Sequence, residues 1–168
     1  RAEQMLGHLI QYLRSSLPSA DESLSTLRVE LERTRAYLEI LQIRMGTRLA
    51  VDVQVPEALM ALQLPAMALQ SLVENAIKHG LEPKPGGGTV WIIARAFDDH
   101  ATVTVADDGL GFGHGTSGTG IGLKNLRERL RLACGPHAGV AIVANFPSGV
   151  AATISLPTVC AKEAAHAA

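Results

Sequence analysis

The spacing of hydrophobic residues changes near Gly46, and this change restricts the fold more than any other feature of the sequence. Before it, hydrophobic residues recur with the period of an α-helix. From Leu49 onward they alternate with polar residues, which is the period of a strand that has one buried face. The chain is therefore predicted to place a helical segment before a domain that contains a β-sheet.

The helical segment is predicted to form two helices. The first ends at Pro18, because proline cannot continue a helix, and the second begins between Asp21 and Ser25 and ends with Gly46 as its C-cap. Three- and four-residue spacing gives the second helix a heptad seam, which requires a partner helix. The seam predicts a helical hairpin that completes its bundle by dimerising, or alternatively one that packs on the domain that follows. The first stripe is Met5, Leu6, Leu9, Ile10, Leu13 and Leu17, and the seam is Leu24, Leu27, Leu31, Thr34, Leu38, Leu41 and Met45.

The rest of the chain alternates strand and helix signals. A helix is predicted from Pro65 to Gly80 and another from Leu123 to Ala133, while the strands are expected at 49–55, 89–97, 101–106, 140–144 and 150–156. These elements predict an α+β fold, a two-layer α/β sandwich with a mixed, mainly antiparallel sheet, preceded by the helical hairpin. The expected divisions are a helical segment at 1–47, a domain at 48–157 and a loose tail at 158–168.

Composition excludes several classes of protein. Apolar residues make up 47% of the chain and the net charge is −1, so a globular core is possible and no basic field indicates nucleic acid as a partner. No apolar run approaches the roughly 18 residues that a membrane span requires, which argues against membrane contact by this segment. Cys134 and Cys160 fit no metal-binding spacing, which favours reduced thiols in the cytoplasm. The chain begins at Arg1 without a signal peptide, so it is expected to be a piece of a longer protein.

Polar residues gather on one side of the predicted helix that ends at Gly80. Glu74, Asn75 and Lys78 lie opposite the apolar face, and His79 lies at its edge. Amide oxygen suits Mg²⁺, and a cationic side chain can offset phosphate charge, although a solvated helix face would have the same pattern.

A second group, Asp107-Asp108-Gly109-Leu110-Gly111, follows directly after a predicted strand. A carboxylate at a strand end can accept a hydrogen bond from the adenine amino group, and the two glycines allow a sharp turn. A plain Asp-Gly turn is the alternative. An EF-hand is excluded, because the twelfth position is Gly118, where a glutamate is needed.

The third group, Gly118-Thr119-Gly120-Ile121-Gly122-Leu123, leads into a helix. Exposed backbone N–H groups and a helix N-terminus suit a polyphosphate, whereas a flexible surface loop is the alternative. The nearby stretch 113–118 fits GxGxxG but opens no helix and has Ala138 where an acid is required, and no GxxxxGK[ST] occurs.

In this order, the three groups resemble the N, G1 and G2 boxes of the Bergerat-fold ATPases, which include gyrase, Hsp90, MutL and histidine kinases. Three segments strongly resemble the LytS-like sensor histidine kinases, and the resemblance covers roughly residues 1–157. These segments are Leu69 to Gly80, Tyr37 to Arg44 and Gly122 to Leu130.

The resemblance implies an ATP-binding catalytic domain that uses Mg²⁺ and transfers the γ-phosphate of ATP to a histidine. It makes Asn75 the Mg²⁺ ligand and Asp107 the adenine acceptor, and it assigns Glu74 to orient or activate the group that attacks the γ-phosphate. Lys78 and His79 join Glu74 as catalytic candidates. It also implies that Gly109 and Gly111 shape the base pocket, that Gly118, Gly120 and Gly122 form the hinged ATP lid, and that Leu123 belongs to the nucleotide-binding residues.

The phosphoacceptor motif of this family, of the Pro-His-Phe-Leu-Phe/Tyr-Asn type, is absent from the sequence. The nearest histidine, His8, lies far from the centre of the apolar stripe of its helix and is interpreted as an ordinary polar residue. We therefore expect the acceptor to lie upstream of Arg1 and the chain not to phosphorylate itself.

The resemblance further implies a homodimer, a response regulator of the LytTR type as partner, and a cytoplasmic segment of a parent protein that can be anchored in the inner membrane. Three alternatives are a conformational ATPase of the gyrase, Hsp90 or MutL type, an anti-sigma serine kinase, and a regulatory module with a degenerate ATP site. The upstream helices, the compact glycine segment and the intact boxes argue against them.

Overall fold

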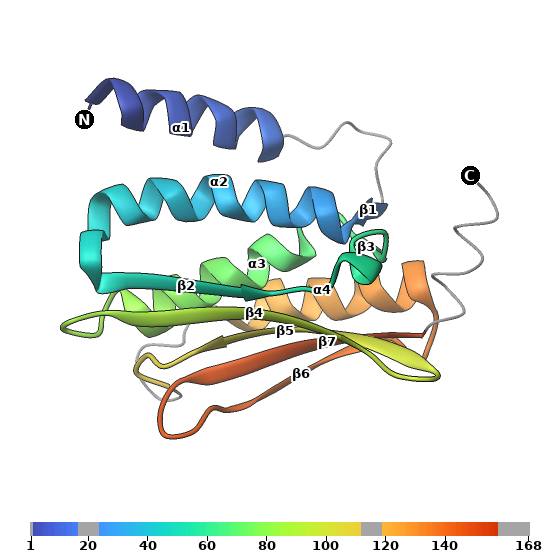
Figure 1. The fold of residues 1–168 in the computed structure, drawn as a ribbon. Helices are drawn as coiled ribbons and strands as arrows, with labels where there is room; N and C mark the ends of the chain where they lie inside the picture. The colour runs from blue at the N-terminus through green and yellow to red at the C-terminus, as the bar shows by residue number, and fades with distance from the viewer. Residues whose placement is uncertain (1, 17–23, 112–118, 158–168) are drawn as a thin grey trace.

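The computed structural model describes residues 2–16, 24–111 and 119–157 and shows two layers, with the helices on one face of a sheet (Figure 1). The five-stranded sheet has the order β2-β4-β5-β7-β6. Strands β2 and β4 pair in parallel, and the other three pairings are antiparallel. The predicted fold class is therefore confirmed. The strands are β2 (Leu49–Gln54), β4 (Gly88–Ala96), β5 (His100–Asp107), β6 (Gly139–Ala144) and β7 (Val150–Pro157).

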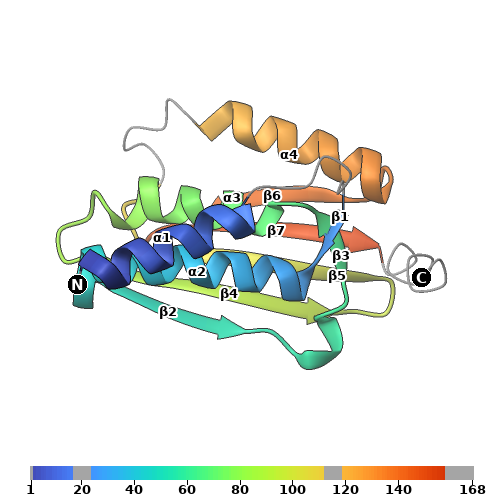
Figure 2. The same cartoon turned by 90° about the horizontal axis from the view of Figure 1, so that it is seen from above.

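The helices stack above one face of the sheet at increasing distance from it (Figure 1). Helices α3 and α4 lie next to the sheet, α2 lies over α3, and α1 lies outermost beside α2 (Figures 1 and 2). Short 3₁₀ turns occur at Gly46–Arg48 and Glu57–Leu59. Among the described helices, none combines the length and apolar character that crossing a bilayer requires. The helices are α1 (Ala2–Ser16), α2 (Leu27–Met45), α3 (Ala68–Asn75), its π-helical continuation η3 (Ala76–Leu81), and α4 (Thr119–Cys134).

The heptad seam of α2 is buried within the chain itself. The four leucines of the seam that lie in α2 and Met45 join the same hydrophobic core as α3 and the sheet, while Leu24 lies before the helix. The outermost helix α1, in contrast, keeps four apolar side chains at 38–57% exposure: Met5, Leu6, Leu9 and Ile10. The seam therefore docks α2 on α3 and the sheet, which together provide the surface that it packs against.

Two helix starts differ from the prediction because of one strand pair. Gln63–Pro65 forms β3, which pairs antiparallel with β1 (Leu24–Thr26), so the helix expected from Pro65 begins at Ala68 instead. For the same reason α2 begins at Leu27, after Thr26, whose side-chain oxygen accepts from the Val29 N–H at 3.3 Å. The pairing joins segments about 40 residues apart, so local sequence patterns do not reveal it.

Other boundaries follow the predictions more closely. Gly46 ends α2 with φ +60°, and its N–H donates to the Gln42 carbonyl. Gly80, predicted as a C-cap, instead lies inside η3, which continues to Leu81. Helix α4 begins at Thr119, four residues before the predicted start, and residues 112–118, in the middle of the glycine-dense stretch 109–122, lie outside the described residues.

Candidate functional site

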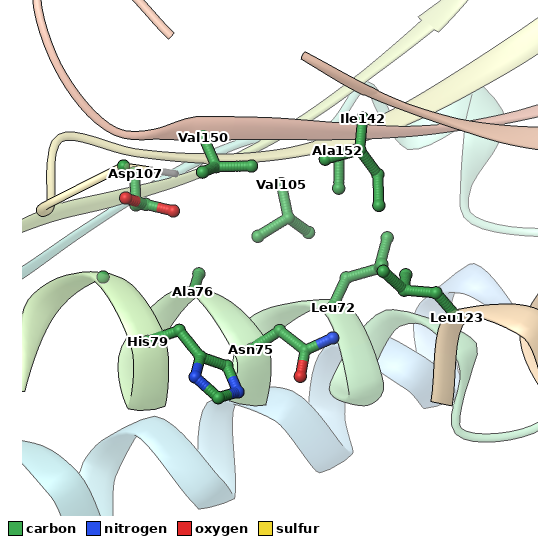
Figure 3. A pocket seen from close by; sticks show the side chains of 12 residues that line it. Leu72, Asn75, Ala76, His79, Val105, Asp107, Leu123, Ile142, Val150 and Ala152 are labelled. Carbon is green, nitrogen blue, oxygen red and sulfur yellow. The ribbon is translucent and has the colours of Figure 1, made fainter. Parts of the chain in front are cut away.

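A pocket of about 210 Å³ lies between α3 and the sheet (Figure 3). Its floor comes from β5, β6 and β7 and its opposite wall from α3 and η3, while Leu123 of α4 closes one side. The pocket is mainly apolar, and its few polar side chains include the Asp107 carboxylate and the Asn75 amide. It is lined by Leu72, Asn75, Ala76, His79, Gly80, Val105, Asp107, Gly111, Leu123, Ile142, Val150 and Ala152.

Asp107 is the carboxylate of this pocket. It is the last residue of β5, which is flanked on both sides by paired strands, and it is 2% exposed. Figure 3 shows its oxygens directed from the sheet toward the helix. Burial raises the pKa of Asp107, and the N–H groups of Gly109 and Val150 oppose that shift by donating to the carboxylate. The Gly109 N–H lies 2.9 Å from Oδ1.

Three glycines from separate segments make room for Asp107. A Cβ atom on Gly80 would lie 2.6 Å from Asp107 Oδ1, and one on Gly149 would lie 1.9 Å from the Asp107 carbonyl oxygen. A Cβ on Gly109 would lie 2.3 Å from the Gly80 carbonyl oxygen. The turn, the helix and the β6–β7 hairpin are therefore packed backbone to backbone around one carboxylate. From the sequence, Gly80 is expected only to end a helix, and neither Gly80 nor Gly149 is predicted to lie at the pocket.

Neighbouring side chains hold the turn after β5 in place. Asp108 Oδ1 accepts from the Thr89 N–H at 2.7 Å, and the Asp108 carbonyl accepts from Lys84 Nζ at 2.6 Å and Ser148 Oγ at 3.0 Å. Asn145 Nδ2 donates to the Asp107 carbonyl at 2.9 Å. These bonds come from the η3–β4 loop, β4 and the β6–β7 hairpin, so the pocket carboxylate sits on a support fixed from several sides.

The polar residues predicted on α3 and η3 separate into two sets. Asn75 and His79, one turn apart, both line the pocket (Figure 3). Glu74 is half-buried, and its Oε1 accepts from Gln70 Nε2 at 3.0 Å, while Lys78 is exposed. The predicted apolar face is correct, because Leu69, Leu72 and Val73 are buried in the core.

The glycine-rich positions also separate. Gly111, with φ +79°, and Leu123 line the pocket, whereas Gly109 supports the turn beneath it. Gly120 and Gly122 fall in the first turn of α4, where a Cβ on Gly122 would meet none of the described atoms within 4 Å. Gly118 lies outside the described residues, and so does most of the predicted lid.

The apolar lining was not singled out from the sequence. Val105, Val150 and Ala152 occupy strand positions that face the helices, beside Ile142 of β6. The period-two alternation predicts that such positions are buried, but it does not show that their side chains stop short of α3 and leave a pocket.

Comparison with known families assigns this two-layer fold and its pocket to a family of ATPases. Residues 62–159 match the family of histidine kinase-, DNA gyrase B- and HSP90-like ATPases, and residues 1–49 match a histidine kinase family. Since the match to the ATPase family covers more than half of the chain, the chain belongs to this family, and within it the chain is similar to the sensor histidine kinases, as the sequence resemblance implied.

Curated relatives point to the same group. The chain is 34% identical over 157 residues to the sensor histidine kinase BtsS of Escherichia coli, covering 94% of the chain and 28% of that protein. It is 33% identical over 144 residues to the sensor protein LytS of Oceanobacillus iheyensis, covering 77% of the chain and 25% of that protein. The chain thus spans about a quarter of the length of these relatives.

Solved structures share the fold. The catalytic domain of histidine kinase ThkA, in a nucleotide-free form, superposes with a TM-score of 0.61 at 18% identity, over 80% of this chain and 93% of that one. The histidine kinase domain of a blue-light activated histidine kinase from Erythrobacter litoralis gives 0.60 at 18% identity, over 95% and 82%. The second superposition includes most of the helical segment.

Proposed function

We propose that this chain is the part of a sensor histidine kinase that binds ATP and presents its γ-phosphate to a histidine located elsewhere in the parent protein. The observation that carries the proposal is the buried Asp107 carboxylate in a pocket that is otherwise mainly apolar. A buried carboxylate is costly unless donors satisfy it, and the purine base of ATP offers a donor within a flat, apolar body.

The pocket residues fit adenine. Val105, Ile142 and Ala152 on the sheet side and Leu72 and Ala76 on the helix side offer apolar surfaces to the two faces of a base. Asp107 would accept from the amino group at the edge of the base. Guanine carries a carbonyl at the equivalent position, so the same carboxylate would oppose it, and selectivity for adenine follows.

The remaining polar residues fit the phosphate end. Bound Mg²⁺ neutralises phosphate charge, and it commonly takes one or two protein oxygens with the rest from water and phosphate. Asn75 offers such an oxygen, and the described residues contain no cluster of three His, Cys, Asp or Glu side chains as a closed metal cage. We assign Glu74 to orient the attacking group, and Lys78 and His79 to offset charge near the phosphates.

The start of α4 provides backbone donors for the same end of the nucleotide. Gly120 and Gly122 lie in its first turn, where N–H groups have no partner within the helix and the helix dipole favours an anion. Gly109 and Gly111 would shape the base pocket and Leu123 would cover it. The role of Gly118 in the lid remains a prediction from the sequence.

The relatives also suggest partners. Sensor histidine kinases act with a response regulator and as dimers, and the likeness to LytS favours a regulator of the LytTR type. We infer that this domain works in the cytoplasm, within a parent protein that can be anchored in the inner membrane.

Phosphotransfer can be tested with γ-labelled ATP. The chain alone should acquire no acid-labile phosphate, because His8 does not lie in an acceptor motif; its Nδ1 lies 3.0 Å from Glu39 Oε2 on α2. The same chain extended to the acceptor histidine of its parent should become labelled. Label mapped to His8 by mass spectrometry, or an extended chain that binds Mg-ATP but stays unlabelled, would contradict the proposal.

The metal role of Asn75 predicts a specific loss. Asn75→Ala removes the amide oxygen, so ATP affinity should lose its dependence on Mg²⁺ in calorimetric titrations with and without the metal. Gln54→Ala, which removes an exposed amide on β2, should keep the wild-type dependence and serves as the control. If the Mg²⁺ titration of the Asn75→Ala protein overlays that of the wild type, Asn75 is a solvated helix residue and not a metal ligand.

A further inference from the structure

The helix that carries Asn75 begins without a cap from its own segment. Met67 occupies the N-cap position of α3 with φ 68°, and its side chain makes no capping hydrogen bond. The preceding residues, Pro65 and Ala66, have no side-chain acceptor either. The first backbone N–H groups of a helix need acceptors from outside the helix, and here they are buried.

Glu30 of α2 supplies the missing acceptor. Its Oε1 accepts from the Leu69 N–H at 3.4 Å, and the carboxylate also accepts from the Met67 N–H. Glu30 is 1% exposed, and its second oxygen lies 3.3 Å from Arg33 Nη1. Burial raises the pKa of Glu30, and the Met67 N–H and the Arg33 guanidinium oppose that shift. A residue from the upstream helix therefore caps the helix of the nucleotide pocket.

Other bonds tie the same junction to its neighbours. At the start of α2, the Leu27 N–H donates to the Leu62 carbonyl at 2.8 Å and the Arg28 N–H donates to the Met60 carbonyl at 3.0 Å. From the opposite side, Arg129 of α4 donates to the Ala66 carbonyl at 2.5 Å. The start of α2 is thus held against the segment that precedes β3, and the entry to α3 is held by Glu30 of α2 and Arg129 of α4.

We propose that Glu30 is a positioning residue of the nucleotide pocket, which as the tertiary cap of α3 links the placement of α2 to the affinity for Mg-ATP. The proposal rests on the proposed function. Asn75 follows Leu69 by six residues, about 9 Å along a helix. So short a helix moves as a unit, and a shift at its first turn displaces Asn75 and His79 relative to Asp107 on the sheet. Movement of α2 would therefore change nucleotide binding without touching the nucleotide.

Three substitutions at one position separate the cap from simple packing. Glu30→Met keeps the length of the side chain but removes the acceptor. Glu30→Gln keeps an acceptor oxygen without charge. Glu30→Asp keeps the carboxylate on a side chain shorter by one methylene, so the acceptor lies farther from α3. Glu32→Met, at an exposed position on the same helix, is the matched control. Each protein would be checked for folding by circular dichroism and titrated with Mg-ATP by calorimetry.

We expect Glu30→Met to raise the Kd by about three- to tenfold, the effect of losing one helix cap, and Glu30→Asp to raise it by about threefold. Glu30→Gln and Glu32→Met should stay within about twofold of wild type. Hydrogen exchange should quicken at the Leu69 and Gln70 amides in the Met protein while the β5 amides keep their protection, because the loss is local.

A folded Glu30→Met protein with wild-type Kd would overturn the proposal, since a purely structural role lowers stability without changing the affinity of the folded state. If Glu30→Met does not fold, a folded Glu30→Asp protein with wild-type Kd would overturn the proposal instead. A wild-type chain that binds no Mg-ATP would refute the proposed function instead. In that case, comparing amide exchange in α3 between the wild type and Glu30→Met would still test whether Glu30 caps the helix.

Discussion

Asp107→Asn should weaken Mg-ATP binding by about one to two decades in Kd, the worth of one hydrogen bond to a charged group. The substitution keeps the size and shape of the side chain, so the pocket should remain intact. The Gly109 N–H at 2.9 Å favours an oxygen at the Oδ1 position. The new NH₂ group then lies where the adenine amino group requires an acceptor, and two donors face each other.

Asp108→Asn is the control for this measurement. Asp108 is the adjacent residue and is absent from the pocket lining; its Oδ1 accepts from the Thr89 N–H at 2.7 Å, which an amide oxygen can also do. The affinity of the Asp108→Asn protein for Mg-ATP should stay near that of the wild type. Equal affinity of the Asp107→Asn protein and the wild type would refute the adenine assignment.

A pH series adds a second readout to the same experiment. Because burial raises the pKa of Asp107, protonation should begin to remove the acceptor at a higher pH than for an exposed aspartate. The affinity of the wild type should therefore fall on acidification over that range. In Asp108→Asn the fall should come at a somewhat lower pH, because the Asp108 charge also raises the pKa of Asp107. The Asp107→Asn protein has no such proton to bind and should lack that component.

Gly149→Ala should lower the free energy of unfolding by about 3 kcal/mol or more, through backbone strain and overpacking together. Gly149 has φ +97°, and a Cβ there would lie 1.9 Å from the Asp107 carbonyl oxygen. Neither atom can rotate away, because the Cβ is bonded directly to the backbone and the carbonyl oxygen is part of it, so the β6–β7 hairpin must move away from β5. That movement also shifts Val150, so the remaining folded protein should bind Mg-ATP more weakly.

Gly135→Ala separates the two contributions. Gly135 has nearly the same φ, +92°, but a Cβ there would meet none of the described atoms within 4 Å. It should therefore show the strain alone, leaving a gap of about 1–3 kcal/mol between the two variants in denaturant titrations. Equal losses of unfolding free energy in the two variants would mean that the β6–β7 hairpin shifts at little cost and that its close approach to Asp107 does not matter for stability.

Much of the fold could be predicted because it is encoded locally. The change of period near Gly46 separates the helical segment from the sheet, and alternation places most of the strands to within a residue or two. The three boxes identified Asn75, His79, Asp107, Gly111 and Leu123, which the structure brings to one pocket. Side chains that carry chemistry at fixed spacing on one helix or one turn can be recognised without knowledge of their surroundings.

By itself, then, the sequence determined the fold class, the family and the polar residues of the pocket. Only the tertiary structure decided that α2 buries its seam on α3, that β1 pairs with β3, that Glu30 caps a helix 39 residues away, and that Gly80 and Gly149 make room for Asp107. The physical reason is that periodicity and turn chemistry depend on neighbours along the chain. A cap, a strand pairing or a close backbone contact between distant segments depends on where packing brings those segments together.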